Sequence, residues 1–156
     1  MRVQKMSRAV MPGMTNHRGI LFGGMLMQWM DELSGIAARR FDGEEVATVS
    51  VKEIRFLRPV PLGTFLDITA QVAAVGNTSL TVSVTAWMDR DGSGEKQEKA
   101  AEGEFVYEAV DEQGKPRKAG KQNENRSSSN YRSRRRPCND GGGGAGPDIN
   151  LPCRCP

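Results

Sequence analysis

Few side chains in residues 1–116 have the chemistry that catalysis needs. This part of the 156-residue chain contains one histidine, His17, and no cysteine. It has no phosphate-binding loop, dinucleotide fingerprint or serine nucleophile elbow, and no His/Asp cluster with the spacing of a metal site. We therefore expect no metal and no cofactor. If the protein is an enzyme, the expected reactive group is a carboxylate.

Asp31 stands out among the carboxylates because it falls within an otherwise apolar helical segment. At helical spacing it shares a stripe of small or polar residues with Gly24, Gln28, Ser34/Gly35 and Ala38. A carboxylate that is buried there must be paired or hydrogen-bonded. Asp31 is therefore a candidate catalytic group. The alternative is structural: Asp31 caps a backbone group or bridges to an arginine across a subunit contact.

The start of this segment and the loop before it supply three further candidates. Gly23-Gly24 at the helix start leaves backbone N–H groups without helical partners, at the positive end of the helix dipole, where a developing oxyanion can be held. Asn16 can hydrogen-bond a water molecule or a carbonyl, and His17 could act as a general base. Each also has a structural alternative: a flexible helix start, a turn residue and a surface histidine.

The elements that must position these residues follow from the spacing of apolar side chains. A helix is predicted from Gly23 to about Arg40, and Asp42-Gly43 is expected to end it. Its apolar residues recur with the period of a helix, at Leu26, Trp29/Met30, Leu33, Ile36/Ala37 and Phe41. Further methionines widen this apolar face, so we expect other parts of the molecule to enclose the helix on most sides. Polar residues interrupt the run, so a membrane span is not expected.

The rest of the domain is predicted to form β-strands. A short strand is expected within residues 3–11. After the helix, apolar and polar residues alternate over 47–56, 66–74, 80–88 and 101–109, with Pro- or Gly-containing turns between them. The alternation shifts by one residue at Lys52-Glu53, which predicts a β-bulge. One helix and four or five strands favour an α+β fold with an antiparallel sheet curled around a central helix, although other α+β arrangements fit the same pattern.

The charge of the chain is distributed unevenly. Residues 1–116 carry 13 basic and 16 acidic side chains, a net charge of −3, whereas residues 117–156 carry 9 and 3, a net charge of +6. The second part also has few apolar residues, so we expect one domain at 1–116 and a disordered, low-complexity basic tail at 117–156. The domain shows no charge-based case for nucleic acid. Without a signal peptide or a cysteine in the domain, a cytoplasmic protein is expected.

The tail leaves two alternatives open. Arginines at 126, 132 and 134–136, close to serines and Tyr131, could contact RNA. The abrupt change of composition after Pro116 could instead mean that the tail is not selected protein sequence. Its three cysteines, Cys138, Cys153 and Cys155, have no matching histidine, so a zinc site is not expected there.

Four motifs within residues 6–116 resemble, in the same order, those of the acyl-CoA thioesterase family of the hot-dog fold. The family's first motif is an Asn, a Gly, Phe-Gly-Gly and then Met-Asp within the helix. In this chain the matching residues are Asn16, Gly19, Phe22-Gly23-Gly24 and Met30-Asp31. The other three motifs are residues 56–63 (FLRPVPLG), 75–79 (VGNTS) and 105–116, which begins with Phe-Val-Tyr.

The resemblance implies a hot-dog fold, with homodimers formed edge to edge and often assembled as trimers of dimers. It also implies acyl-CoA as the substrate, hydrolysed to free fatty acid and CoA at the dimer interface. Each site would combine Asn16 of one protomer with Asp31 of the other. Asp31 would act as general base or nucleophile and Asn16 would position the water or the carbonyl. The Gly24 N–H would stabilise the oxyanion.

The resemblance further implies where the substrate binds. The residues expected to contact the acyl chain or CoA are His17, Phe22, Gly23, Arg55, Arg58, Gly76, Asn77, Thr78 and Ser79. CoA is then part of the substrate and not a cofactor. The alternative function is a non-catalytic acyl-CoA-binding regulator with the same fold, which would need neither Asn16 nor Asp31.

Overall fold

The computed structural model describes residues 2–89, 92–94 and 97–120. The chain divides into two units, residues 1–125 and 126–156, and the second unit lies outside the described residues. The predicted tail, residues 117–156, therefore lies outside the described residues from residue 121 onward. This part includes the arginines of the RNA-binding alternative and the three cysteines.

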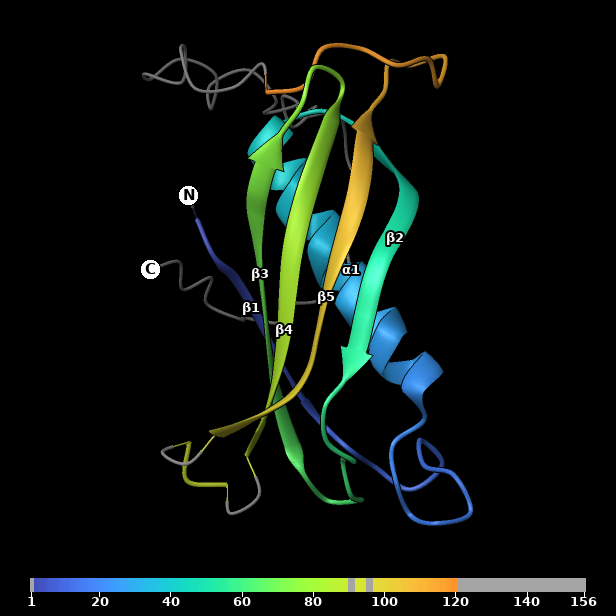
Figure 1. Ribbon diagram of the computed structural model, residues 1–156, viewed down its shortest axis with the longest axis vertical. Helices are drawn as coiled ribbons and strands as arrows, with labels where there is room; N and C mark the ends of the chain where they lie inside the picture. Colours follow the sequence, from blue (N-terminus) through green and yellow to red (C-terminus); the bar gives the residue numbers. More distant parts are fainter. Residues whose placement is uncertain (1, 90–91, 95–96, 121–156) are drawn as a thin grey trace, which may run out of the picture. The chain divides into compact units, whose positions relative to one another are not determined.

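In the described part of the chain, five antiparallel strands form one sheet, and a long helix lies across one face of it (Figure 1). The helix is α1 (Gly23–Asp42). The strands are β1 (Gln4–Ala9), β2 (Val46–Phe56), β3 (Phe65–Val75), β4 (Ser79–Asp89) and β5 (Gln97–Ala109). Their order in the sheet is β1-β3-β4-β5-β2, which leaves β1 and β2 as the edges. The predicted α+β fold, an antiparallel sheet around one central helix, is confirmed.

The helix α1 is held on the sheet by one apolar face, as the period of its apolar residues predicts. That face contains the buried side chains of Leu26, Trp29, Met30, Leu33 and Ala37. They pack in one core with alternate residues of the central strands, such as Ile68 of β3 and Val82 of β4, both fully buried. Within the described residues, no helix combines the length and the hydropathy that a membrane span requires.

The other face of α1 is open in the single chain. Met27 and Ile36, nine residues apart and so at opposite margins of the buried face, are 39% and 37% exposed. The expected enclosure of the helix on most sides is therefore wrong for one chain, because the sheet covers only one face. The helix ends where predicted, at Gly43, whose φ of 87° favours glycine and whose N–H donates to the Arg39 carbonyl oxygen at 2.8 Å.

The register between β2 and β5 decides which side chains meet under the helix. It shifts twice, between Thr48 and Ser50 and between Val51 and Glu53. The second shift confirms the bulge predicted at Lys52-Glu53, whereas the first was not predicted. Thr48 is paired directly with Tyr107 of β5, so the two side chains lie on the same face of the sheet.

The residues after β5 are tied back to the end of α1. Asp42, the last residue of the helix, is fully buried. Its carboxylate accepts hydrogen bonds from the Arg117 guanidinium and, at 2.8 Å, from the Gly120 N–H. The bond to Asp42 raises the pKa of Arg117 above its usual value. The packed part of the chain therefore reaches beyond Pro116, where we expected it to end.

Breaking this buried pair should destabilise the domain. We expect Arg117→Ala to lower the free energy of unfolding by about 3 to 5 kcal/mol, because it leaves the Asp42 carboxylate buried without its cation. Chemical denaturation monitored by circular dichroism measures this change. Arg39→Ala is the matched control: Arg39 pairs with Glu45 on the surface, and its loss should cost less than about 1 kcal/mol. Equal stability of the two variants would contradict the prediction.

Candidate active site

Asp31 lies in the middle of α1, where hydroxyl groups from two strands reach its carboxylate. The Tyr107 hydroxyl donates to Asp31 Oδ1 at 2.9 Å, and the Thr48 hydroxyl lies 3.4 Å from the same oxygen. Asp31 is exposed in the single chain, so the burial that made it a candidate is not seen; the fully buried carboxylate of α1 is Asp42. What distinguishes Asp31 is an accessible carboxylate with a fixed orientation.

Tyr107 is the centre of this hydrogen-bond network. It is 2% exposed, and its hydroxyl also lies 2.7 Å from Ser34 Oγ and 3.1 Å from the Asp31 carbonyl oxygen. Burial, together with the neighbouring Asp31 carboxylate, raises the pKa of Tyr107 to about 12. The phenol is therefore neutral and a hydrogen-bond donor at ordinary pH.

Neither Tyr107 nor Thr48 was among the residues predicted for the site. Both residues follow the alternating pattern of a strand. From this pattern alone, a tyrosine is interpreted as a core side chain and not as a site residue. One signal was available in the sequence: a tyrosine on a buried face needs a polar partner for its hydroxyl. The sequence could not say which residue would be that partner.

Asn16 shapes the loop that precedes the helix. Its side-chain oxygen accepts hydrogen bonds from the N–H groups of Arg18 at 2.9 Å and Ile20 at 3.2 Å. The loop thereby presents His17, which is exposed, at its tip. No contact joins Asn16 to Asp31 among the described residues of one chain. The structure of one chain therefore does not bring the two predicted catalytic side chains together.

The start of α1 offers backbone N–H groups, as predicted. Phe22 precedes the helix and makes no side-chain cap, and the first helical hydrogen bond is from the Leu26 N–H to the Phe22 carbonyl oxygen at 3.1 Å. Gly24 is exposed, with nothing within 4 Å of where a Cβ would stand, whereas a Cβ at Gly23 would lie 3.3 Å from the Phe56 ring. Gly24 is therefore the less crowded of the two glycines.

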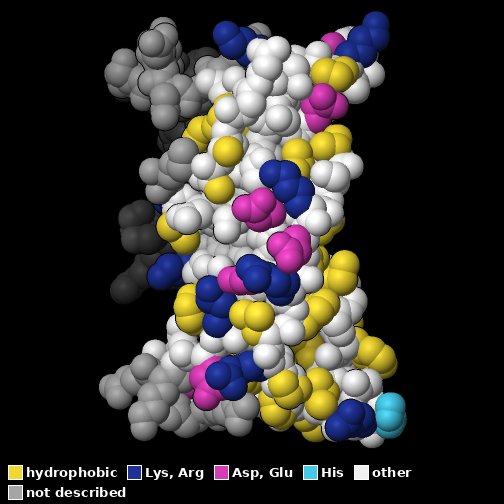
Figure 2. Space-filling model, viewed as in Figure 1, with side chains coloured by type: hydrophobic (Ala, Val, Ile, Leu, Met, Phe, Trp, Pro, Cys, Tyr) yellow, Lys and Arg dark blue, Asp and Glu magenta, His cyan; other side chains and the backbone are white. Residues whose placement is uncertain are grey.

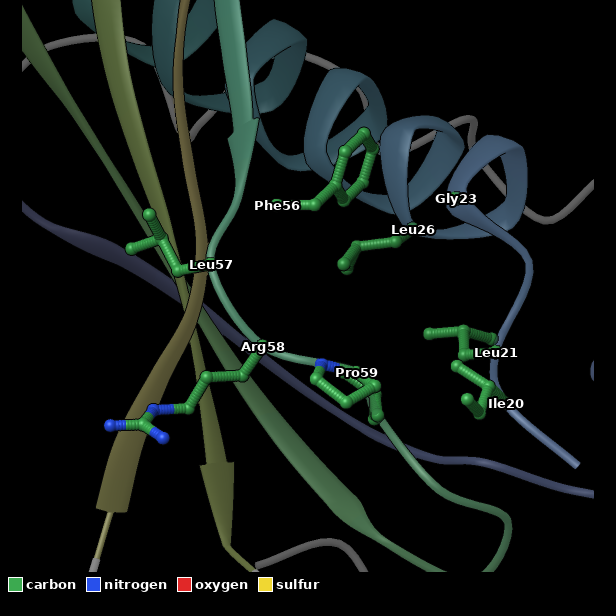
Figure 3. Close-up of a pocket in the computed structure, with 9 residues that line it drawn as sticks. Ile20, Leu21, Gly23, Leu26, Phe56, Leu57, Arg58 and Pro59 are labelled. Carbon is green, nitrogen blue, oxygen red and sulfur yellow. The ribbon is translucent and has the colours of Figure 1, made fainter.

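A cavity of about 230 Å³ lies beside this helix start (Figure 3). It is lined mostly by apolar side chains, including Leu21, Leu26 and Phe56. Arg58 belongs to the lining, but its guanidinium points away from the helix (Figure 3). The Arg58 guanidinium lies 3.4 Å from the Glu98 carboxylate. An apolar group fits this cavity better than a charged one does.

The basic residues predicted to bind CoA are paired with acidic neighbours. Arg55 lies 2.6 Å from the Glu102 carboxylate. The pKa of Glu102 is lowered, first by a hydrogen bond from Lys99 and also by the charges of Lys99 and Arg55, so it remains ionised beside Arg55. Figure 2 shows basic and acidic side chains interspersed over this face of the molecule. Arg55 and Arg58 therefore do not form a positively charged patch.

The predicted turn at Gly76, Asn77, Thr78 and Ser79 lies at the other end of the sheet from Arg58 (Figure 1). The Thr78 carbonyl oxygen accepts from the Ala109 N–H at 2.8 Å, and Ala109 is paired with Val46 at the start of β2. Arg55 and Arg58 lie at and beyond the far end of that strand, roughly 30 Å away. One chain therefore does not bring the two predicted CoA-binding segments together. Within the described residues, no group of three metal-ligating side chains could hold a metal ion.

Solved structures with this fold include acyl-CoA hydrolases. One is the acyl-CoA hydrolase of Staphylococcus aureus in complex with butyryl coenzyme A and coenzyme A. It has 34% sequence identity and a TM-score of 0.72, and the match covers 75% of this chain and 71% of that one. Another is the hexameric thioesterase y2039 of Yersinia pestis, with 34% identity, a TM-score of 0.67 and coverage of 73% and 92%.

Three structures of the S. aureus enzyme carry single alanine substitutions with an informative spacing. The replaced residues are an asparagine, an aspartate 15 residues later and a threonine 17 residues after that. In this chain the same two spacings separate Asn16, Asp31 and Thr48. Among the described residues, Thr48 and Tyr107 contact the Asp31 carboxylate.

The sequence comparisons agree with the structural ones. The sequence model of the thioesterase superfamily matches residues 18–95. The acyl-CoA thioester hydrolase YciA of Salmonella typhimurium is 39% identical over 110 residues, which cover 69% of this chain and 82% of that protein. The chain therefore belongs to the thioesterase superfamily, and its predicted resemblance to the hot-dog acyl-CoA thioesterases is confirmed.

Proposed function

We propose that this protein hydrolyses acyl-CoA thioesters to free fatty acid and CoA. The main observation behind the proposal is that the accessible carboxylate of Asp31 is hydrogen-bonded by the hydroxyls of Tyr107 and Thr48. It is supported by relatives that are acyl-CoA thioester hydrolases and by a structural neighbour that binds butyryl coenzyme A. The alternative, a regulator that binds acyl-CoA without turnover, has no use for a carboxylate held in this way.

In the proposed reaction, Asp31 takes a proton from water while the water oxygen attacks the thioester carbonyl carbon. The resulting oxyanion collapses, the carbon–sulfur bond breaks, and the CoA sulfur takes the proton back from Asp31. A second route has Asp31 as the nucleophile, with water then hydrolysing the mixed anhydride. In both, Asn16 positions the water or carbonyl and the Gly24 N–H stabilises the oxyanion.

The proposed site combines two protomers. Among the described residues of one chain, the Asn16 side chain bonds only its own loop, and the Asp31 carboxylate bonds only Tyr107 and Thr48. Gly24 precedes Asp31 by seven residues, about 10 Å along the axis of α1. We therefore assign Asn16 and Gly24 to one half of the site and Asp31, with Thr48 and Tyr107, to the half that the partner supplies. The hexameric Y. pestis thioesterase supports a trimer of dimers as the assembly.

The edge strand β2 is the proposed dimer contact. It is an edge of the sheet, and its Val49 and Val51 are 53% and 44% exposed. Across a twofold axis two copies of β2 run antiparallel, so the Phe56 end of one lies beside the Val46 end of the other. This places Arg55 and Arg58 of one protomer at the same end of the joint sheet as the Gly76–Ser79 turn of its partner. One CoA molecule could then contact both segments.

The proposed role of Asp31 predicts a loss of turnover. We expect Asp31→Asn to lower kcat for acyl-CoA hydrolysis by about 10²- to 10⁴-fold, because the amide cannot accept the proton. A thiol-trapping reagent follows CoA release. Glu32→Gln is the matched control: Glu32 is the next residue of the helix and pairs with Arg8 on the surface. Tight acyl-CoA binding without turnover in the unmodified protein would favour the regulator instead.

The two-protomer site predicts complementation between inactive variants. Asn16→Ala and Asp31→Asn proteins, unfolded together and refolded, should form heterodimers with one intact site each. With random pairing, half of the dimers are heterodimers, so roughly a quarter of the wild-type activity should return. Each variant refolded alone is the control. If both catalytic residues came from one chain, no activity would return.

A further inference from the structure

The hydrogen bond between Tyr107 and Asp31 can have only one direction. A carboxylate oxygen accepts here, and Asp31 Oδ1 at 2.9 Å is nearer to the phenol oxygen than the Asp31 carbonyl oxygen at 3.1 Å, so the single phenol proton of Tyr107 points to Oδ1. The Ser34 hydroxyl, 2.7 Å from the phenol oxygen and 3.0 Å from the Asp31 carbonyl oxygen, completes the network. Because the pKa of Tyr107 is raised to about 12, the phenol keeps this proton throughout the ordinary pH range.

The packing around Tyr107 leaves its hydroxyl little freedom to move. Its cross-strand neighbours are Leu80 of β4 and Thr48 of β2. On the helix side, a Cβ at Gly35 would stand 3.7 Å from the ring and from the hydroxyl oxygen, so the ring lies directly against the helix backbone. The side chain is 2% exposed. The phenol is therefore a rigid support between β5 and α1.

Among residues 2–89, 92–94 and 97–120, the groups that face this phenol contain a single charge. From α1 they are Asp31 and Ser34, from β2 Thr48, and from β4 Leu80. Of these, Asp31 alone is charged. Burial raises the pKa of Tyr107 most, the hydrogen bonds to Ser34 and Thr48 lower it, and the Asp31 carboxylate raises it.

We propose that Tyr107 is a positioning residue for thioester hydrolysis: by occupying Oδ1 of Asp31 it fixes the carboxylate plane and leaves Oδ2 to receive the water proton. This inference rests on the proposed function and adds a residue to it. Tyr107 touches no reacting atom and acts through Asp31. The Asp31 carboxylate is exposed, so without this support it would lose its preferred orientation by side-chain rotation, and the general base would be misplaced.

The first test separates kcat from KM. Tyr107→Phe keeps the ring and removes only the hydroxyl, and we expect kcat to fall by about 10- to 100-fold, since it deletes a hydrogen bond to a charged group, while KM for a short acyl-CoA changes less than about twofold. Thr69→Val is the matched control, because it removes a strand hydroxyl that bonds only the Thr85 carbonyl oxygen at 3.4 Å. Its kcat should equal that of the wild type.

The second test measures the ionisation of the Tyr107 phenol directly. In an alkaline titration of tyrosinate absorbance, one of the two tyrosines should titrate near pH 12, and Tyr107→Phe should remove that transition. Asp31→Asn should lower the pKa of Tyr107, because the amide no longer repels the phenolate as the carboxylate does. An unchanged titration in Asp31→Asn would mean that the two groups are not coupled and would overturn the proposal.

The turnover of the Asp31 and Tyr107 variants distinguishes a failure of the Tyr107 proposal from a failure of the proposed function. If Asp31→Asn retains wild-type turnover, the proposed catalytic role of Asp31 fails, and the role of Tyr107 fails with it. If Asp31→Asn is inactive but Tyr107→Phe has wild-type kcat, only the positioning role is overturned. A Tyr107→Phe protein with a lower melting temperature and a raised KM at wild-type kcat would show a purely structural residue and would overturn it as well.

Discussion

The packing of α1 across the sheet governs both the core of this structure and the position of its candidate site. A 20-residue helix that crosses a sheet buries polar groups as well as apolar ones, and each buried polar group needs a partner. At the middle of the helix, the Tyr107 hydroxyl hydrogen-bonds Asp31 and Ser34. At its end, the Asp42 carboxylate accepts from Arg117 and from the Gly120 N–H. Every buried side-chain nitrogen or oxygen among the described residues has a hydrogen-bond partner. The same packing that stabilises the fold thus orients the candidate catalytic carboxylate.

The second constraint is that one sheet covers only one face of a helix. The open face of α1 carries both apolar residues and Asp31, and the edge strand β2 carries exposed valines. Apolar surface of this kind at a sheet edge favours association with a second copy. The arrangement explains why the predicted site residues are separated in one chain. Asn16 and Gly24 lie at one end of α1 and Asp31 lies about 10 Å further along it.

Much of the fold could be predicted from the sequence because it depends on local pattern. The helix, its end at Gly43 and the bulge at Lys52-Glu53 follow from periodicity and from glycine. The first bulge of β2 could not be predicted, since Val49 continues the alternation without a break. The limit of the packed region was also missed, because the composition changes at Pro116 whereas the contacts of Asp42 reach Gly120. The ion pair between Asp42 and Arg117 depends on two individual residues, which the average composition of a segment does not indicate.

The elements, their turns and the family could be inferred from the sequence alone, because these depend on periods and short spacings along the chain. Asp31 could be singled out in the same way, as a carboxylate within an apolar helix. The groups that surround it depend on how the helix and the sheet pack. Tyr107 is 76 residues from Asp31 in sequence, and their hydrogen bond exists because β5 lies in the sheet directly under α1. A contact over that separation depends on how helix and sheet pack, which no local pattern encodes.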